Sequence, residues 1–137
     1  MRIRNLETLT GHGNAEGRRD VCAILEAGLE ASDPYYNACR LVSLENGRLV
    51  IGAKEFEPIG SPHTGTDEYD LKDIDRIFVF GAGKGIQRVA KALEEKLGDR
   101  LSGGHLIVKH GDEDIVEKIK VTHGGHPIPD EEGAAGC

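Results

Sequence analysis

The chain has 137 residues, a net charge of −7 and an isoelectric point near 5.3. This length is sufficient for one hydrophobic core. The acidic balance and an aromatic content of 4% exclude nucleic acid as a partner, because no basic surface or stacking platform can be assembled. No apolar run approaches a membrane span, and the N-terminus lacks the apolar core of a signal peptide. We therefore expect no membrane partner either.

The cysteines indicate the redox compartment. Cys22, Cys39 and Cys137 are odd in number and widely spaced. Such a set predicts reduced thiols in a cytoplasmic protein rather than a disulfide framework.

Two helices in tandem are expected after an irregular arm over residues 1–13. Asn14 can cap a helix that runs to about Ser32. Its apolar residues recur at helical spacing on one face: Val21, Ile24, Leu25 and Leu29. Asp33 and Pro34 then begin a second helix that reaches about Leu41, because aspartate is a favoured N-cap and proline fits the first turn.

A hairpin and a loop follow these helices. Asn46-Gly47 stands between two short apolar runs and predicts a β-hairpin over residues 41–51. Residues 52–67 are rich in glycine, proline and threonine, which indicates an exposed loop. Tyr69 and Leu71 predict a short edge strand after it.

From residue 76 onwards the pattern is strand, helix, strand, helix, strand. Strands are expected near 76–80, 105–109 and 119–122, and the first of them, being entirely apolar, is expected to be buried on both faces. This order predicts an α/β fold, a Rossmann-like open parallel sheet with flanking helices.

The two crossover helices are expected over 85–97 and about 112–118. Gly98 is a natural C-cap of the first helix. Four charged residues at its end are expected to face water: Glu94, Glu95, Lys96 and Arg100.

The turn after the first parallel strand predicts an anion site. Gly81, Gly83 and Gly85 permit positive φ and leave room for an approaching group, and Lys84 adds a positive charge. The N-terminus of the helix that follows favours an anion at the same corner. The turn matches neither well-known phosphate motif. Ile86 replaces the third glycine of the dinucleotide fingerprint, and the Walker A spacing fails at Phe78 and Gly85.

A second unusual turn follows the third parallel strand. Gly124 and Gly125 free its backbone, and Asp130 can cap a helix that begins at Glu131. His123 and His126 could be considered as a metal pair, but they lie in a loop without a third clustered ligand, so no metal site is predicted. Taken singly, His126 could be a structural hydrogen bonder and Asp130 a simple cap. Both turns follow parallel strands, whose carboxyl ends meet at one edge of the sheet, so we expect one shared ligand site there.

These residues resemble a known family. Gly81-Ala-Gly-Lys84, the Val89-Ala-Lys-Ala-Leu-Glu94 helix, Gly103-Gly104 before a strand and Gly125-His-Pro-Ile-Pro-Asp130 are similar to the N-terminal region of the glycerate 2-kinases. The resemblance covers residues 14–137 and concerns the two-domain type with a MOFRL C-terminal domain. It implies that residues 1–137 are the N-terminal part of a glycerate-kinase-like α/β domain, a truncation that lacks the C-terminal domain.

The resemblance implies an activity. Glycerate 2-kinases phosphorylate the 2-hydroxyl of D-glycerate with ATP and Mg²⁺, in a cleft between two domains. By this resemblance Lys84 is the catalytic lysine, and the turn that contributes Gly81, Ala82, Gly83 and Gly85 binds an anionic group. His126 and Asp130 would shape the opposite wall. The partner would be a small-molecule substrate.

The fragment is expected to be inactive alone, because one domain cannot form a cleft between two. Its exposed apolar face would favour a homo-oligomer. The alternative is a non-catalytic Rossmann-like module that binds a nucleotide or a phosphorylated small molecule. Its dinucleotide version requires an acidic residue at the end of the next strand, yet Val108-Lys109-His110 stands there. A remnant without a ligand, associating through its sheet edge, is a third reading.

Overall fold

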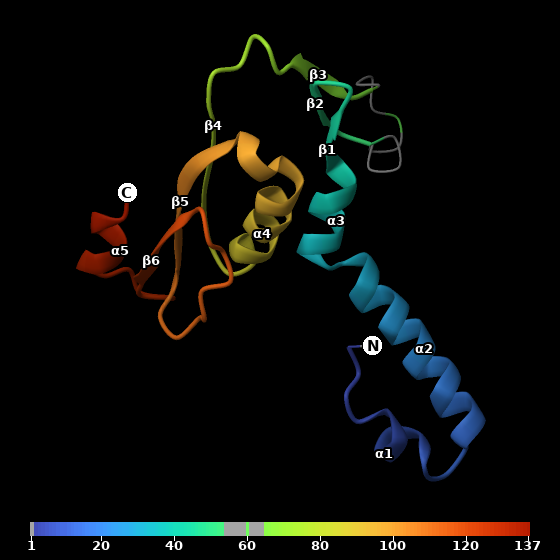
Figure 1. Cartoon of the computed structure of the whole chain (residues 1–137). Coiled ribbons are helices and arrows are strands. Elements are labelled where there is room, and N and C mark those ends of the chain that lie inside the picture. Colours follow the sequence, from blue (N-terminus) through green and yellow to red (C-terminus); the bar gives the residue numbers. More distant parts are fainter. Residues whose placement is uncertain (1, 54–59, 61–64) are drawn as a thin grey trace.

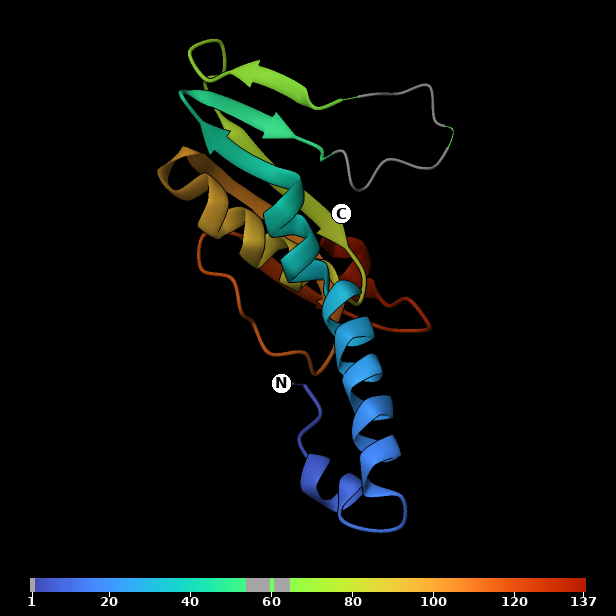
Figure 2. The same ribbon diagram turned by 90° about the vertical axis from the view of Figure 1, so that its right-hand side faces the viewer.

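The computed structural model describes residues 2–53, 60 and 65–137. Their strands form two three-stranded sheets, one antiparallel and one parallel. An N-terminal pair of helices extends away from both sheets as an arm (Figures 1 and 2). The expected α/β fold with a parallel sheet and flanking helices is confirmed.

The arm begins with α1 (Leu6–Thr10) and continues with α2 (Ala15–Ala31). The expectation of an irregular arm is therefore wrong over α1, which is closed by the Thr10 hydroxyl donating to the Leu6 carbonyl at 3.0 Å. The predicted cap of α2 is confirmed, because Asn14 Oδ1 accepts from the Gly17 N–H at 3.0 Å. This polar contact satisfies one of the helix's unpaired amides.

The apolar stripe of α2 is exposed. Its four large apolar residues lie in solvent rather than against a core: Val21, Ile24, Leu25 and Leu29. Cys22 is the buried residue of this helix. The helix was thus predicted correctly, but the large residues of its apolar face remain exposed although α1 lies against it.

The helix α3 (Pro34–Leu41) leads into the antiparallel sheet. Its strands are β1 (Val42–Glu45), β2 (Arg48–Ile51) and β3 (Asp67–Asp70), in that order. Asn46 and Gly47 both have positive φ, 51° and 79°, as a two-residue type I′ turn requires. The hairpin and the short edge strand are confirmed. Most of the loop expected over 52–67 lies outside the described residues.

The parallel sheet contains β4 (Ile77–Ala82), β5 (Leu101–Lys109) and β6 (Lys120–Gly124) in sequential order. The helix α4 (Ile86–Leu97) covers one face, and a 3-10 turn, η2 (Gly98–Arg100), joins it to β5. A last short helix, α5 (Glu131–Ala135), packs against β6. The core lies between α4 and the sheet, and its buried members are Leu49, Ala90, Leu97, Leu101, Leu106, Val108 and Ile119.

The strand β4 is buried on one face only, contrary to expectation. Ile77 and Val79 pack against the core under α4, whereas Phe80 on the other face is 73% exposed. The reason is topological: β4 is the edge strand of the sheet, and α5 lies against β6 at the opposite edge. A run of apolar residues therefore did not distinguish one buried face from two.

The connection between β5 and β6 is not the helix expected over 112–118. Its residues have no helical assignment, because α4 side chains take the place of helical hydrogen bonds. Gln87 Nε2 donates to the Glu113 carbonyl at 3.1 Å, and Gln87 Oε1 accepts from the Ile115 N–H at 3.0 Å. One buried amide thus pairs with both a donor and an acceptor of an extended segment.

Glu94 is the second anchor of this connection, and the expectation that it faces water is wrong. It is only 6% exposed. Its carboxylate accepts from the N–H groups of Glu117 at 2.9 Å, Lys118 at 2.6 Å and Ile119 at 3.1 Å. A buried charge is tolerated here because several donors replace its hydration.

Two of the other charged residues expected in water also have partners. The Arg100 guanidinium donates to the carbonyls of Leu71 at 2.9 Å and Ile74 at 2.8 Å. Glu95 accepts a short hydrogen bond from the Tyr35 hydroxyl, which raises the pKa of Tyr35 to about 12. These contacts join the antiparallel sheet and α3 to the parallel sheet layer.

Asp33 connects three segments. Its carboxylate accepts from Arg88 of α4 at 2.7 Å and from Arg2 at 2.7 Å, and it caps α3 through the Tyr35 N–H at 2.9 Å. The Arg88 guanidinium, followed by that of Arg2, holds the pKa of this carboxyl well below its usual range. The carboxylate is almost fully buried.

None of the helices in the described ranges combines the length and the hydropathy needed to span a bilayer.

We expect Glu94→Ala to destabilise the protein by about 2–4 kcal/mol, because it leaves several buried amides without an acceptor. The free energy of unfolding from urea denaturation measures the effect. Lys96→Ala, on the exposed side of the same helix, is the control and should change stability by less than about 0.5 kcal/mol. A Glu94→Ala protein as stable as this control would show that the carboxylate does not organise the crossover.

Asp33 should make stability depend on pH. Its pKa is depressed by folding, so its contribution is fully present above the unfolded pKa of about 3.9 and is lost as pH falls towards the lower folded value. Asp33→Asn keeps a capping side chain but removes the charge. Between pH 5 and pH 2 the wild-type protein should therefore lose more stability than the variant, by up to about 1.4 kcal/mol per pH unit.

Urea denaturation at stepped pH measures this difference. Asp75→Asn, at an exposed position, is the control and should retain the wild-type slope. Equal slopes for Asp33→Asn and the wild-type protein would contradict the assignment.

Candidate functional site

The two glycine turns border one cleft of about 660 Å³ at the carboxyl edge of the parallel sheet. Both turns and the end of β5 contribute residues that line the cleft, among them Ala82, Gly83, Lys84, Lys109, Gly125 and His126. The expectation that Lys84 and His126 lie at the same edge is confirmed. β5 pairs in parallel with β4 on one side and with β6 on the other. The turns that follow β4 and β6 therefore lie at the same edge of the sheet.

Within the first turn, the glycines have different tasks. Gly83 has φ of 114° and donates its N–H to the Ile107 carbonyl at 3.1 Å, so this amide is not available to a ligand. A Cβ at Gly81 would lie 2.5 Å from Ile86 Cγ1. Gly81 therefore permits close packing of α4 on β4 and does not line the cleft. Gly85 does not line the cleft either, and a Cβ at this position would lie 3.6 Å from Pro34 Cγ.

The available donors of this turn are at the start of α4. Its N-cap is Gly85, which has no capping side chain. The N–H groups of Lys84 and Gly85 make no hydrogen bond within the described part of the chain. Unpaired amides and the positive end of the helix dipole favour an anion, and the Lys84 side chain adds a full charge. The geometry is thus suited to a carboxylate or phosphate oxygen.

The second turn is fixed from behind by Asp130. Its Oδ1 accepts from the Gly133 N–H at 2.8 Å, which confirms the predicted cap of α5. The N–H groups of Gly133 and Gly125, with His110, lower the pKa of Asp130 to about 2. Asp130 does not itself line the cleft. It supports the turn whose exposed residue, His126, does.

His126 follows Gly125 on the wall of the cleft and precedes a cis peptide bond to Pro127. Its ring makes no hydrogen bond to any other described residue. The alternative in which His126 only pins the turn therefore has no support in the described contacts. The imidazole is exposed and available to a ligand.

His123 is separate from this wall. Its Nε2 pairs with Asp114 Oδ1 at 3.0 Å, and its Nδ1 lies 3.4 Å from the Lys109 carbonyl oxygen. The three-residue cluster of potential metal ligands that the described residues form contains neither His123 nor His126. His123 and His126 thus lie in different surroundings, His123 with its own partners and His126 on the wall of the cleft.

Sequence reasoning missed two residues at the end of β5, its last residue Lys109 and the next residue His110. Lys109 lines the cleft and forms an ion pair with Asp112. His110 Nε2 lies 2.7 Å from Asp130 Oδ2. The signal was present, because both residues stand at the carboxyl end of a parallel strand, where the two glycine turns also lie.

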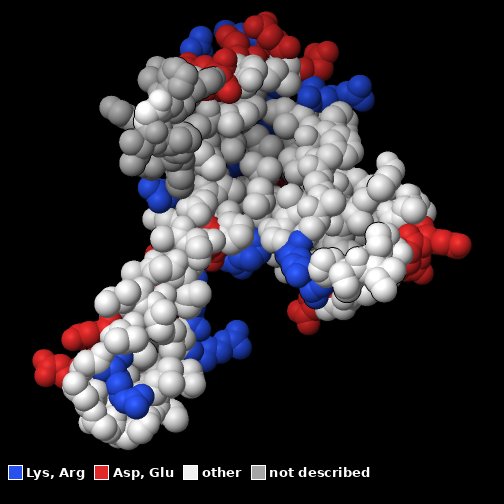
Figure 3. All heavy atoms as spheres, turned by 180° about the vertical axis from the view of Figure 1, so that it is seen from behind, with Lys and Arg blue, Asp and Glu red and all other residues white. Residues whose placement is uncertain are grey.

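The charge of the cleft suits an anion and not a metal ion. Lys84 and Lys109 are its charged side chains, and the described residues that line it include no acidic side chain. Mg²⁺ prefers carboxylate oxygens, so these residues do not fit a Mg²⁺ ion bound by the cleft itself. The acidic side chains gather elsewhere, at α5 and around the antiparallel sheet (Figure 3).

Residues 20–137 match the family model described as "Domain of unknown function (DUF4147)". The chain belongs to this family. The match covers most of the sequence and includes both glycine turns, and the predicted resemblance to the N-terminal region of the glycerate 2-kinase family is confirmed.

Two curated relatives of this DUF4147 chain carry an enzyme name. "Glycerate 2-kinase" of Pyrococcus horikoshii is 29% identical over 109 residues, which are 80% of this chain and 21% of the relative. "D-glycerate 2-kinase" of Thermotoga maritima is 29% identical over 90 residues, 65% of this chain and 22% of the relative. The chain therefore spans about a fifth of the length of these relatives.

A solved structure shares the fold. The crystal structure of the PH0495 protein from Pyrococcus horikoshii superposes with a TM-score of 0.66 at 24% identity, over 91% of this chain and 26% of that one. This likeness supports the arrangement of elements described above.

We expect Lys84→Ala to weaken the binding of inorganic phosphate by about three- to tenfold, because it removes the full charge but leaves the amides of the turn. The shifts of the Lys84 and Gly85 amide signals in NMR titrations measure the affinity. Lys120→Ala, on the exposed start of β6, is the charge-matched control and should bind as the wild-type chain does. Equal loss in both variants would mean that only net charge matters.

Proposed function

We propose that this chain forms one wall of the active site of a cytoplasmic glycerate 2-kinase, which transfers a phosphoryl group from ATP to the 2-hydroxyl of D-glycerate. The observation that carries the proposal is the cleft in which both family turns meet, with Lys84 on one side and His126 on the other. The names of the curated relatives supply the reaction.

In this proposal the first turn binds an anionic oxygen of the substrates. The backbone amides of Lys84 and Gly85 are fixed at the start of α4, so they need little reorganisation, and the Lys84 ammonium group supplies the charge. A fixed cation near the transferring phosphoryl group would neutralise its developing charge. Bound to the glycerate carboxylate instead, the same lysine would orient the 2-hydroxyl.

The second turn lies across the described cleft from the first turn, within the same domain. His126 can donate to or accept from a substrate hydroxyl, and the Asp130 contacts keep its turn in place. Mg²⁺ is proposed as the ion that accompanies ATP, with ligands outside the described cleft. ATP and D-glycerate are proposed as its small-molecule partners.

A non-catalytic module that binds a phosphorylated small molecule is the alternative. One observation favours it: the described cleft has cationic and neutral groups but no acidic side chain that could act as a general base or bind a metal. Cationic and neutral groups of this kind are sufficient to bind an anion but do not by themselves catalyse a reaction.

We expect residues 1–137 to form no measurable 2-phosphoglycerate from Mg²⁺, ATP and D-glycerate. Transfer requires both substrates in line and water excluded, and one wall of a cleft provides neither condition. In a chain long enough to catalyse the reaction, Lys84→Ala should lose nearly all activity. Lys84→Arg should not restore it, because a planar guanidinium does not replace a compact ammonium group in a tight turn.

A coupled assay for 2-phosphoglycerate decides between these outcomes. Product formed at a robust rate by residues 1–137 would overturn the proposal that this chain supplies only one wall of the active site. Near-normal turnover by Lys84→Ala in the active longer chain would overturn the role of the lysine. Lys120→Ala is the control in that chain as well.

A further inference from the structure

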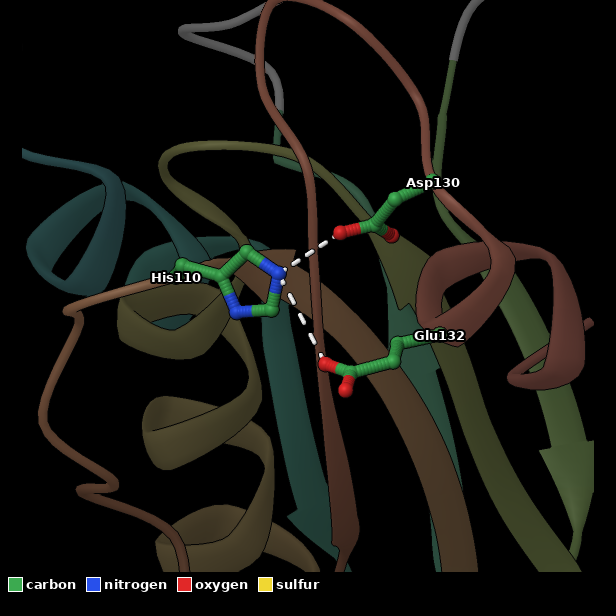
Figure 4. Close-up of side chains that lie close together, drawn as sticks. All are labelled: His110, Asp130 and Glu132. Atoms are coloured by element: carbon green, nitrogen blue, oxygen red, sulfur yellow. Dashed lines mark hydrogen bonds and ion pairs between the residues drawn. The ribbon is translucent and has the colours of Figure 1, made fainter.

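Three potential metal ligands lie close together around the end of β5 and the start of α5 (Figure 4). His110 follows β5, Asp130 precedes α5, and Glu132 lies in the first turn of α5. The distance from His110 Nε2 is 2.7 Å to Asp130 Oδ2 and 3.7 Å to Glu132 Oε2. All three ligand atoms lie within 4.8 Å of one another.

These separations are close to those of a metal site. With metal–ligand distances of about 2.0–2.1 Å, tetrahedral coordination places neighbouring ligand atoms about 3.4 Å apart. The separation of His110 from Asp130 is shorter than this value, that from Glu132 is slightly longer, and no pair is more than 4.8 Å apart. Side-chain rotation can adjust distances of this size.

Two of the three ligands are already oriented by the fold. The backbone N–H of His110 donates to the Gly124 carbonyl at 3.0 Å, which fixes the backbone from which the imidazole projects. Asp130 Oδ1 accepts from the Gly133 N–H, which leaves Oδ2 directed at His110. Hydrogen bonds of this kind orient ligands in metal sites. Glu132 is exposed and can complete the set by rotation.

We propose that His110, Asp130 and Glu132 bind a divalent transition-metal ion, Zn²⁺ in particular, with the fourth position open to water. One imidazole and two carboxylates are ligands that Zn²⁺ accepts in open, three-residue sites. An imidazole nitrogen disfavours Mg²⁺, which prefers oxygen ligands in octahedral geometry. This site is therefore distinct from the Mg²⁺ that accompanies ATP, and it does not depend on the proposed kinase reaction.

The ion would lie one side chain away from the cleft. Asp130 also accepts from the backbone of the second turn, in which Gly125 and His126 line the cleft. Metal binding would thus fix the turn that carries His126. The neighbouring His123–Asp114 pair provides a comparison, because it has the same first two ligand types but belongs to no three-residue cluster among the described residues.

Isothermal titration of the 137-residue chain with Zn²⁺ tests the proposal, with Co²⁺ as a spectroscopic probe. We expect one ion per chain, and at least about tenfold weaker binding for His110→Ala and for Glu132→Ala. The matched controls are His123→Ala and Glu131→Ala, which should stay within twofold of the wild-type affinity. Glu132 is exposed, so its replacement does not endanger the fold.

Three results would overturn the site. The first is a Zn²⁺ affinity that falls equally in the variants and in their controls, or that falls in none of them. The second is a thiolate charge-transfer band in the Co²⁺ spectrum, which would place the ion at a cysteine such as Cys137. The third is displacement of Zn²⁺ by Mg²⁺ at equal concentration, which would contradict the ligand chemistry.

Discussion

The arrangement of the parallel sheet depends on two buried polar side chains of α4. Gln87 and Glu94 pair with the backbone of the segment between β5 and β6, which has no regular structure of its own. Without these acceptors and donors, the buried peptide groups of the crossover would be left unpaired. Because the crossover delivers β6 to its place beside β5, α4 indirectly positions the second glycine turn opposite the first.

The edge of the sheet separates two kinds of electrostatic environment. The cleft is lined by Lys84 and Lys109 and is suited to anions, whereas the neighbouring His110, Asp130 and Glu132 are suited to a cation. Asp130 belongs to both, since one of its oxygens supports the turn and the other meets His110. The backbone of the second glycine turn thus lies between a cleft suited to anions and a cluster suited to a cation.

Local patterns predicted the fold well. The Asn46-Gly47 hairpin, the caps at Asn14 and Asp130 and the shared edge of the two turns depend on residues close in sequence or on general rules of parallel sheets. The errors concern contacts between distant segments. The role of Glu94 depends on amides some two dozen residues away, and surface spacing on α4 gave no sign of it. His110 was missed for the same reason, because its partner Asp130 belongs to another element.

The α1–α2 arm has a consequence for how the molecule opens. Its apolar stripe is in solvent, and a polar contact, the pairing of Arg2 with Asp33, joins it to the rest of the described chain. Segments with little buried area exchange their amide hydrogens through local unfolding, at a lower free energy than the core. The arm should therefore lose protection in hydrogen exchange while β5, with Leu106 fully buried, remains closed. Two cooperative units that meet at the start of α3 are the expected result.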